Sequence, residues 1–172
     1  MIGHMDAHDL LAAALDIERH VHADGWDQPP LLFALVPTDR IRKEQPELAA
    51  ELGVTAAGPV LTSFEQDPPP ADTELDVFLA GIEWPDPISA AAVVVERIVL
   101  PPEAEAEVLD RPDAASAARA HPAAQDMRVV VAASRDGQSM CALRLRGADD
   151  ESVLTGADLV PALAEALLAT FR

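Results

Sequence analysis

Apolar residues recur along the chain with two periods, which predict alternating helices and strands. A spacing of 3.6 residues over Asp6–Asp24 indicates an amphipathic helix whose apolar stripe has Glu18 at its edge. Apolar runs predict strands at Leu31–Val36, Val60–Glu65 and Ser89–Leu100, the last of them rich in β-branched residues. The first half of the chain therefore alternates between helical and extended segments.

Proline and glycine mark where the intervening helices begin and end. Residues Thr38–Leu52 have a helical pattern, but Pro46 should divide it into two pieces, with Gly53 ending the second. A short helix is expected over residues 72–82, where Asp or Thr can cap the first turn.

Three further segments are predicted in the second half of the chain, apart from a hairpin between them. The Pro-, Ala- and Glu-rich residues 101–125 predict one or two short helices in a long connection. Residues 147–152 should form an acidic loop. A last helix is expected to begin at about Leu159 with Asp158 as its cap, and its apolar residues recur at the spacing of a broad core face.

The segment Asp126–Arg146 predicts a β-hairpin around Asp136 and Gly137. A two-residue turn would mix polar and apolar side chains on both faces. A three-residue turn with Gly137 in the left-handed conformation instead gives one clean apolar face, so we favour it. This register places Arg128 directly opposite Arg144. The second face is expected to be solvent-exposed and to carry, besides the arginines, Val130, Ala132, Met140 and Ala142.

Together these elements predict an α+β fold with a mainly antiparallel five-stranded sheet and helices packed on one face. The expected order is α-β-α-β-α-β-β-β-α, with the last three strands forming an antiparallel meander. The length of 172 residues, without a repeat or a composition break, indicates a single α+β domain over residues 5–172. Residues 1–4 resemble a cloning scar that precedes a natural start at Met5.

Composition and charge restrict the classes of partner. The chain is 49% hydrophobic, which supplies a core, and its formal charge of −18 disfavours nucleic acid and anionic membranes as partners. No apolar run reaches the roughly 18 residues of a membrane span. Cys141 is the single cysteine, so the chain has no internal disulfide and no cysteine-based metal site. We expect a cytoplasmic protein with Cys141 as an inert, buried side chain.

Arginines gather where the predicted hairpin meets the preceding strand. Two like charges directly opposite each other, such as Arg128 and Arg144, destabilise a sheet unless acids compensate them. Asp126 should face Arg146, and Glu96 can approach from the neighbouring strand. With acidic partners the arginines are structural; without them, their guanidinium groups suit a phosphate or a carboxylate. The candidate ligand-binding residues are Glu96, Arg97, Arg128, Arg144 and Arg146.

The chain shows no catalytic or cofactor signature. His20 and His22 lie two positions apart on one predicted helix and point about 200° apart, so they cannot share a metal ion. We expect them instead to form surface ion pairs with Asp16 and Glu18, four positions earlier. Sequence motifs of serine hydrolases, phosphate-binding loops, zinc proteases and dinucleotide sites are absent. We therefore predict no catalytic residue, no metal ion and no cofactor.

Several segments resemble a family of uncharacterised actinobacterial proteins of similar length. They are Ile17–His20, Gly25–Val36, Val93–Pro102, Cys141–Arg146 and Leu154–Leu163. The resemblance implies an intracellular protein and assigns no catalytic residue. The order of helices and strands is also similar to that of bacterial secretion chaperones, which are small, acidic and often dimeric.

The features above favour a non-enzymatic protein-interaction domain, of an adaptor or chaperone-like kind. Its partner would be another protein or a second copy of the chain, held on the exposed face of the sheet. The alternative is a binding protein or enzyme for a small anionic ligand, which would use the arginines on the sheet.

Overall fold

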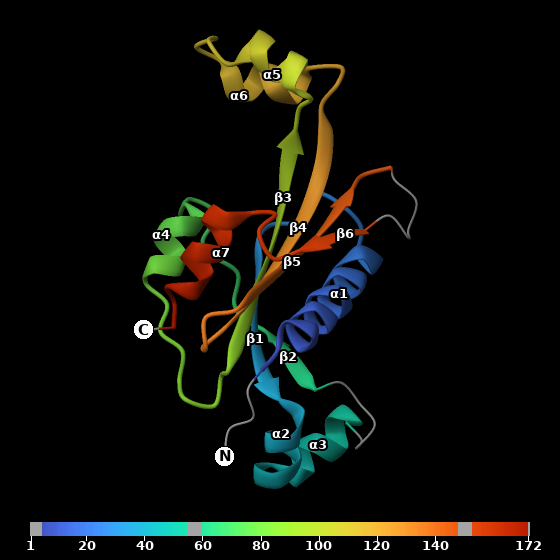
Figure 1. Cartoon of the computed structure of the whole chain (residues 1–172), viewed down its shortest axis with the longest axis vertical. Helices are drawn as coiled ribbons and strands as arrows, with labels where there is room; N and C mark the ends of the chain where they lie inside the picture. Colours follow the sequence, from blue (N-terminus) through green and yellow to red (C-terminus); the bar gives the residue numbers. More distant parts are fainter. Residues whose placement is uncertain (1–4, 55–59, 148–152, 172) are drawn as a thin grey trace.

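A six-stranded antiparallel sheet forms the centre of the computed structural model, which describes residues 5–54, 60–147 and 153–171 (Figure 1). The strands lie in the order β2-β1-β3-β4-β5-β6, so β2 and β6 are its edges. Their bounds are Leu31–Pro37 for β1, Leu61–Glu65 for β2, Ala90–Val99 for β3, Gln125–Ser134 for β4, Ser139–Leu145 for β5 and Val153–Gly156 for β6. The predicted α+β class and the meander of β3, β4 and β5 are confirmed.

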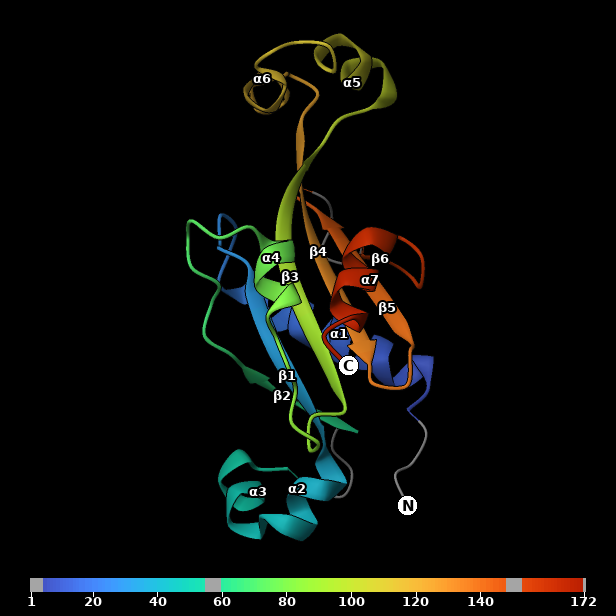
Figure 2. The ribbon, with the colours of Figure 1, turned by 90° about the vertical axis from the view of Figure 1, so that its left-hand side faces the viewer.

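Helices cover both faces of the sheet. Helix α1 (Ala7–Ala23) packs on one face, and α4 (Leu75–Ala80) and α7 (Pro161–Leu168) pack on the other (Figures 1 and 2). The prediction of helices on one face is therefore wrong. The reason lies in the central strands, where β1, β3 and β4 carry continuous apolar runs that place buried side chains on both faces.

Two helical pairs lie at opposite ends of the sheet. Helices α2 (Thr38–Glu44) and α3 (Pro46–Leu52) follow β1, and α3 ends at Gly53, as predicted, with Gly53 in the left-handed conformation. Helices α5 (Pro102–Val108) and α6 (Ala114–Ala120) lie beyond the extended ends of β3 and β4 (Figure 1). Each pair thus extends the molecule along the strand direction.

Two predicted helices begin later than expected. Helix α4 starts at Leu75 rather than at residue 72 or 73, and α7 has Pro161 as its first residue. A proline is suited to the first turn of a helix because its missing N–H has no partner there in any case. The expected cloning scar and most of the acidic loop lie outside the described residues.

The sheet has six strands rather than the predicted five, because β6 was not recognised. This strand pairs with β5, with Gly156 opposite Cys141 and Leu154 opposite Leu143. Four residues are too few to establish an alternating pattern. This segment is a strand because it pairs with β5, and its own sequence does not indicate that pairing.

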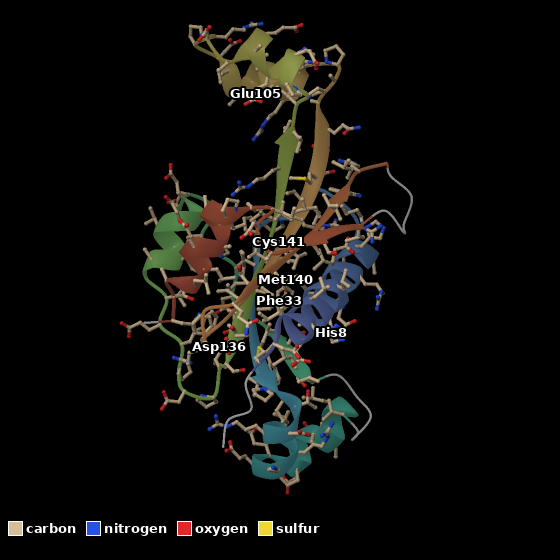
Figure 3. All side chains as sticks on the ribbon, in the orientation of Figure 1. His8, Phe33, Glu105, Asp136, Met140 and Cys141 are labelled. Carbon is tan, nitrogen blue, oxygen red and sulfur yellow. The ribbon has the colours of Figure 1, made fainter. Side chains whose placement is uncertain are left out.

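The predicted register of the β4–β5 hairpin is confirmed. Arg128 lies opposite Arg144, and Gly137 occupies the turn with a φ of 96°. The expected exposure of the second face is wrong, because α1 covers it. Figure 3 places Phe33, Met140 and Cys141 in the middle of the molecule, between α7 and α1. The strand residues buried beneath α1 include Phe33, Leu35, Val130, Ala132 and Ala142.

Candidate functional site

Three of the predicted arginines come together beside the last turn of α1, and we call Arg128, Arg144 and Arg146 the arginine cluster. Arg128 in β4 has Arg144 of β5 on one side and Glu96 of β3 on the other. Arg97 does not join them. It follows Glu96 in β3, so it points to the opposite face of the sheet, where it is exposed.

Glu18 of α1 compensates the like-charge pair. Both its carboxylate oxygens accept hydrogen bonds from Arg144, one from Nε and one, at 2.9 Å, from Nη2. Its Oε1 also lies 3.7 Å from Nη1 of Arg128. Glu18 and both arginines are buried, so the carboxylate neutralises charge where water cannot.

Glu96 joins the cluster to the segment that follows α1. Its Oε2 lies 3.7 Å from Nη2 of Arg128. Its two oxygens also accept hydrogen bonds from the backbone N–H groups of Asp27, at 2.8 Å, and Gln28, at 3.1 Å. The acidic neighbour expected from β3 is therefore present, and it fixes a loop as well as an arginine.

Arg128 is fully buried and makes two further polar contacts. Its Nη2 donates to the carbonyl oxygen of Gly25 at 2.5 Å, and its Nη1 lies 3.1 Å from Nδ1 of His22. Because an arginine can only donate hydrogen bonds, Nδ1 of His22 is the acceptor of the second contact. The Nε of Arg128 is buried with no hydrogen-bond partner among the described residues.

Trp26 covers the cluster from the solvent side. Its ring lies 4.4 Å from the guanidinium carbon of Arg128 and 5.7 Å from that of Arg146, which are cation–π distances. The exposed Arg146 forms ion pairs with Asp126 at 2.8 Å and with Asp27 at 3.2 Å, and the hydrogen bonds to these carboxylates raise the pKa of Arg146. The predicted pair of Asp126 and Arg146 is therefore present.

This arrangement binds one part of the chain to another. The three arginines face four carboxylates among the described residues, so their charges are balanced within the protein. Such saturation favours the structural alternative over an anion site, because each guanidinium already contacts an acid. The four carboxylates belong to Glu18, Asp27, Glu96 and Asp126.

The expected ion pairs of His20 and His22 with Asp16 and Glu18 stay a prediction. Asp16 bonds Arg19 at 3.3 Å, and the carboxylate of Glu18 turns inward to the arginines. Glu18 is in phase with the apolar stripe of α1, and this spacing is the signal for an inward carboxylate. The sequence prediction places Glu18 at the edge of the stripe instead, whereas the structure buries it. Trp26 and Asp27 are not among the predicted site residues, because nothing in the local sequence indicates that they lie beside the arginine cluster.

Other chemistry is sparse in the described part of the chain. Cys141 is buried in the apolar layer under α7, and burial raises the pKa of its thiol. No group of three or more His, Cys, Asp or Glu side chains in residues 5–54, 60–147 and 153–171 is placed to hold a metal ion. Within the same ranges, no helix has the length and apolar character required to cross a bilayer.

A second surface feature is a group of apolar side chains on the face of the sheet that also carries α7. Met127 lies opposite Leu145, and Leu143 lies opposite Leu154, so all four side chains share this face. The Leu159 side chain lies against Gly156 on the same side. We call these residues the open sheet face: Met127, Leu143, Leu145, Leu154 and Leu159.

Comparison with known proteins identifies the family. A search of curated proteins and a search of solved structures each found no match. The family described as PPA1309-like protein matches residues 10–172, which includes all the segments described above except the first residues of α1. This match agrees with the resemblance noted in the sequence, whose actinobacterial range stays a prediction. The chain belongs to the PPA1309-like protein family.

Proposed function

We propose that this chain is a non-enzymatic protein-binding domain that holds a basic, partly apolar segment of another protein on the open sheet face. The observation that carries the proposal is the exposure of large apolar side chains on β5, on β6 and in the segment that follows β6. Leu154 is 60% exposed, Leu145 38% and Leu159 37%. Clustered exposed leucines on one face are typical of surfaces that a partner covers.

The edge of the sheet supports the same proposal. Among the strands of the described residues, β6 pairs with β5 alone, so its outer side is an edge of the sheet to which a further strand can be added. A bound segment in the extended conformation would continue the sheet and place every second side chain over Leu154. This mode needs no pocket and no catalytic group.

The charge of the chain indicates the chemistry of the partner. A formal charge of −18 repels a second copy of the chain and attracts a segment rich in Lys and Arg. The proposed occupant therefore alternates apolar residues with basic ones. Self-association is the competing outcome, and the experiment below distinguishes the two.

A library of 12-residue peptides displayed on phage provides the test. Selection on the intact chain should enrich basic peptides with alternating apolar residues. The best synthetic peptide should bind at least tenfold more weakly to Leu154→Asp, as measured by fluorescence anisotropy. Val77→Asp is the matched control, since Val77 is also 60% exposed but lies on α4.

Two outcomes would contradict the proposal. One is selection that enriches no such peptide, or peptides that bind Leu154→Asp as tightly as the original chain. The other is a stable dimer in sedimentation equilibrium that Leu154→Asp dissociates, which would make a second copy the occupant. Thermal unfolding of both variants confirms that they are folded.

A further inference from the structure

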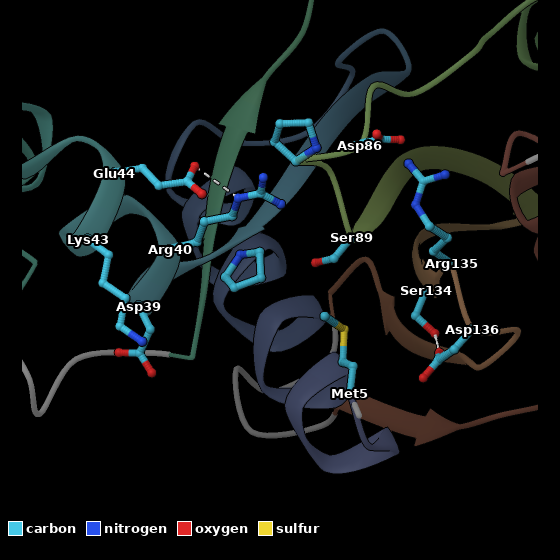
Figure 4. Close-up of a pocket in the computed structure, with 12 residues that line it drawn as sticks. Met5, Asp39, Arg40, Lys43, Glu44, Asp86, Ser89, Ser134, Arg135 and Asp136 are labelled. Atoms are coloured by element: carbon cyan, nitrogen blue, oxygen red, sulfur yellow. Dashed lines mark hydrogen bonds and ion pairs between the residues drawn. The ribbon is translucent and has the colours of Figure 1, made fainter. Parts of the chain in front are cut away.

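A cavity of about 710 Å³ lies beside α2 (Figure 4), and no residue of the arginine cluster or of the open sheet face lines it. It is open to solvent on one side and is bordered by α2, by the segment that leads into β3 and by the turn between β4 and β5. Its volume lies within the roughly 300–1,000 Å³ of small-molecule sites. Pro37, Pro87 and Met5 supply apolar wall, and the remaining lining is polar.

Ser89 brings an unsatisfied hydroxyl group to this cavity. Its backbone is fixed at both ends, since its N–H donates to Leu35 at 3.1 Å and its carbonyl oxygen accepts from Arg135 at 2.8 Å. The Oγ atom is buried and has no hydrogen-bond partner among the described residues. Figure 4 shows the hydroxyl directed into the cavity. A buried hydroxyl without a partner is costly, so a bound molecule that bonds it is favoured.

Arg40 approaches the same space from α2. Its Nε donates to Glu44 at 3.0 Å, which holds the side chain in place. Its terminal nitrogens point into the cavity toward Ser89 (Figure 4) and make no hydrogen bond to the described residues. Two parallel N–H groups of a guanidinium match the two oxygens of a carboxylate.

The other charged groups around the cavity are already engaged or lie at its rim. Asp39 pairs with Arg42, and Asp136 accepts a hydrogen bond from Ser134. The guanidinium of Arg135 donates to three backbone carbonyl groups and lies over a phenyl ring, so it is not available. Those carbonyl groups belong to Trp84, Pro85 and Ile88, and the ring to Phe171.

The geometry points to a binding site for a small monocarboxylate in this cavity. Its carboxylate would accept two hydrogen bonds from the terminal nitrogens of Arg40 and one from the Ser89 hydroxyl. Lys43, exposed on α2 at the rim, adds positive charge. A polyphosphate is disfavoured, because the acids Asp39, Glu44, Asp86 and Asp136 line the same cavity and repel a ligand with several negative charges more strongly than one with a single charge.

Paired ligands test the charge requirement. Butyrate and benzoate are titrated into the intact chain by ¹H–¹⁵N NMR, with butyramide and benzamide as neutral controls of the same shape. At least one carboxylate should bind saturably and at least tenfold more tightly than its amide, with shifts at residues of the cavity. Equal binding of acid and amide, or no saturable binding below 10 mM in the millimolar range of weak ligands, overturns the site.

Matched variants test the residues. Arg40→Gln should weaken carboxylate binding at least tenfold, and Ser89→Ala should weaken it several-fold without lowering the Tm. Arg111→Gln is the control, because Arg111 is also an exposed arginine with an ion pair but lies between α5 and α6. Unchanged binding in Arg40→Gln and Ser89→Ala contradicts the proposal. If Arg40→Gln does not fold, Lys43→Gln replaces it, with a smaller loss of affinity as the expected result and none as the contrary one.

Discussion

Glu18 of α1 and Arg144 of β5 form a buried ion pair that fastens the helix to the sheet. The same carboxylate lies 3.7 Å from Arg128, so one acid on the helix serves two arginines that face each other across β4 and β5. Without it, two like charges would be buried side by side. The packing of α1 over the sheet therefore has an electrostatic requirement as well as an apolar one.

Replacement of Glu18 tests this requirement. Glu18→Gln should lower the free energy of unfolding by about 3–5 kcal/mol, because it leaves two buried guanidiniums without their shared carboxylate. Urea denaturation followed by circular dichroism measures the change. Asp16→Asn is the control, since its pair with Arg19 is exposed and should contribute at most about 1 kcal/mol. Equal effects of the two variants would show that Glu18 is not a buried partner.

The saturation of the arginine cluster gives a second prediction. Inorganic phosphate should raise the Tm no more than sodium chloride at the same ionic strength, because Arg128 and Arg144 already face carboxylates. Differential scanning fluorimetry makes the comparison. A saturable rise with phosphate that disappears in Arg146→Gln would instead support the anion site.

Cys141 should be unreactive in the folded protein. Burial raises the pKa of its thiol, and the reactive form is the thiolate. Ellman's reagent at pH 8 should therefore react slowly with the native chain and at once with the chain in 6 M guanidinium, a strong denaturant. Fast reaction of the native chain would place the thiol at the surface.

The raised pKa of the Cys141 thiol also makes the stability of the fold depend on pH, in a direction that can be stated. The folded thiol holds its proton to a higher pH than the unfolded one. Its contribution is therefore complete below the pKa of the unfolded thiol and declines as pH rises toward the folded value. Cys141→Ala should remove this part of the alkaline loss of stability, as measured by urea midpoints at rising pH.

The turn between β4 and β5 depends on a glycine. Gly137 has a φ of 96°, so Gly137→Ala should cost about 1 kcal/mol or more through backbone strain. Gly81→Ala is a suitable control, because Gly81 has a φ of −90° and an added methyl group would meet its nearest atom at 3.6 Å. Urea midpoints that shift equally in both variants would contradict the turn conformation.

The pair of helices α5 and α6 should be dispensable for folding. Val99 and Gln125 already lie opposite each other, so a tight Asn-Gly turn can replace residues 100–124. We expect the shortened chain to keep a cooperative thermal transition within a few degrees of the original Tm. Loss of the cooperative transition would show that the two helices support the sheet.

The sequence predicted well those features that depend on local pattern. Alternation in Asp126–Arg146 was sufficient to choose the register of β4 and β5, because a shift by one residue would have mixed both faces. The split at Pro46 followed likewise from the chemistry of one residue. Features that depend on distant partners were missed. Glu18 was in phase with the stripe of α1, but the sequence does not indicate which strands lie beneath that stripe.

The sheet illustrates the same limit. The apolar runs of β3 and β4 identified buried strands, but the number of layers depends on which helices return to which face. Strand β6 has four residues and exists through its pairing with β5. The cavity beside Arg40 and Ser89 likewise joins three segments that no local pattern connects.

The separation of Glu18 and Arg144 along the chain has a consequence for synthesis. They are 126 positions apart, so translation at roughly 5–20 residues per second leaves Glu18 without its partner for about 6–25 s. During that interval we expect the unpaired carboxylate to disfavour burial of the apolar stripe of α1, because an unpaired charge is costly to remove from water. A nascent chain arrested before β5 should therefore leave α1 undocked and open to proteases.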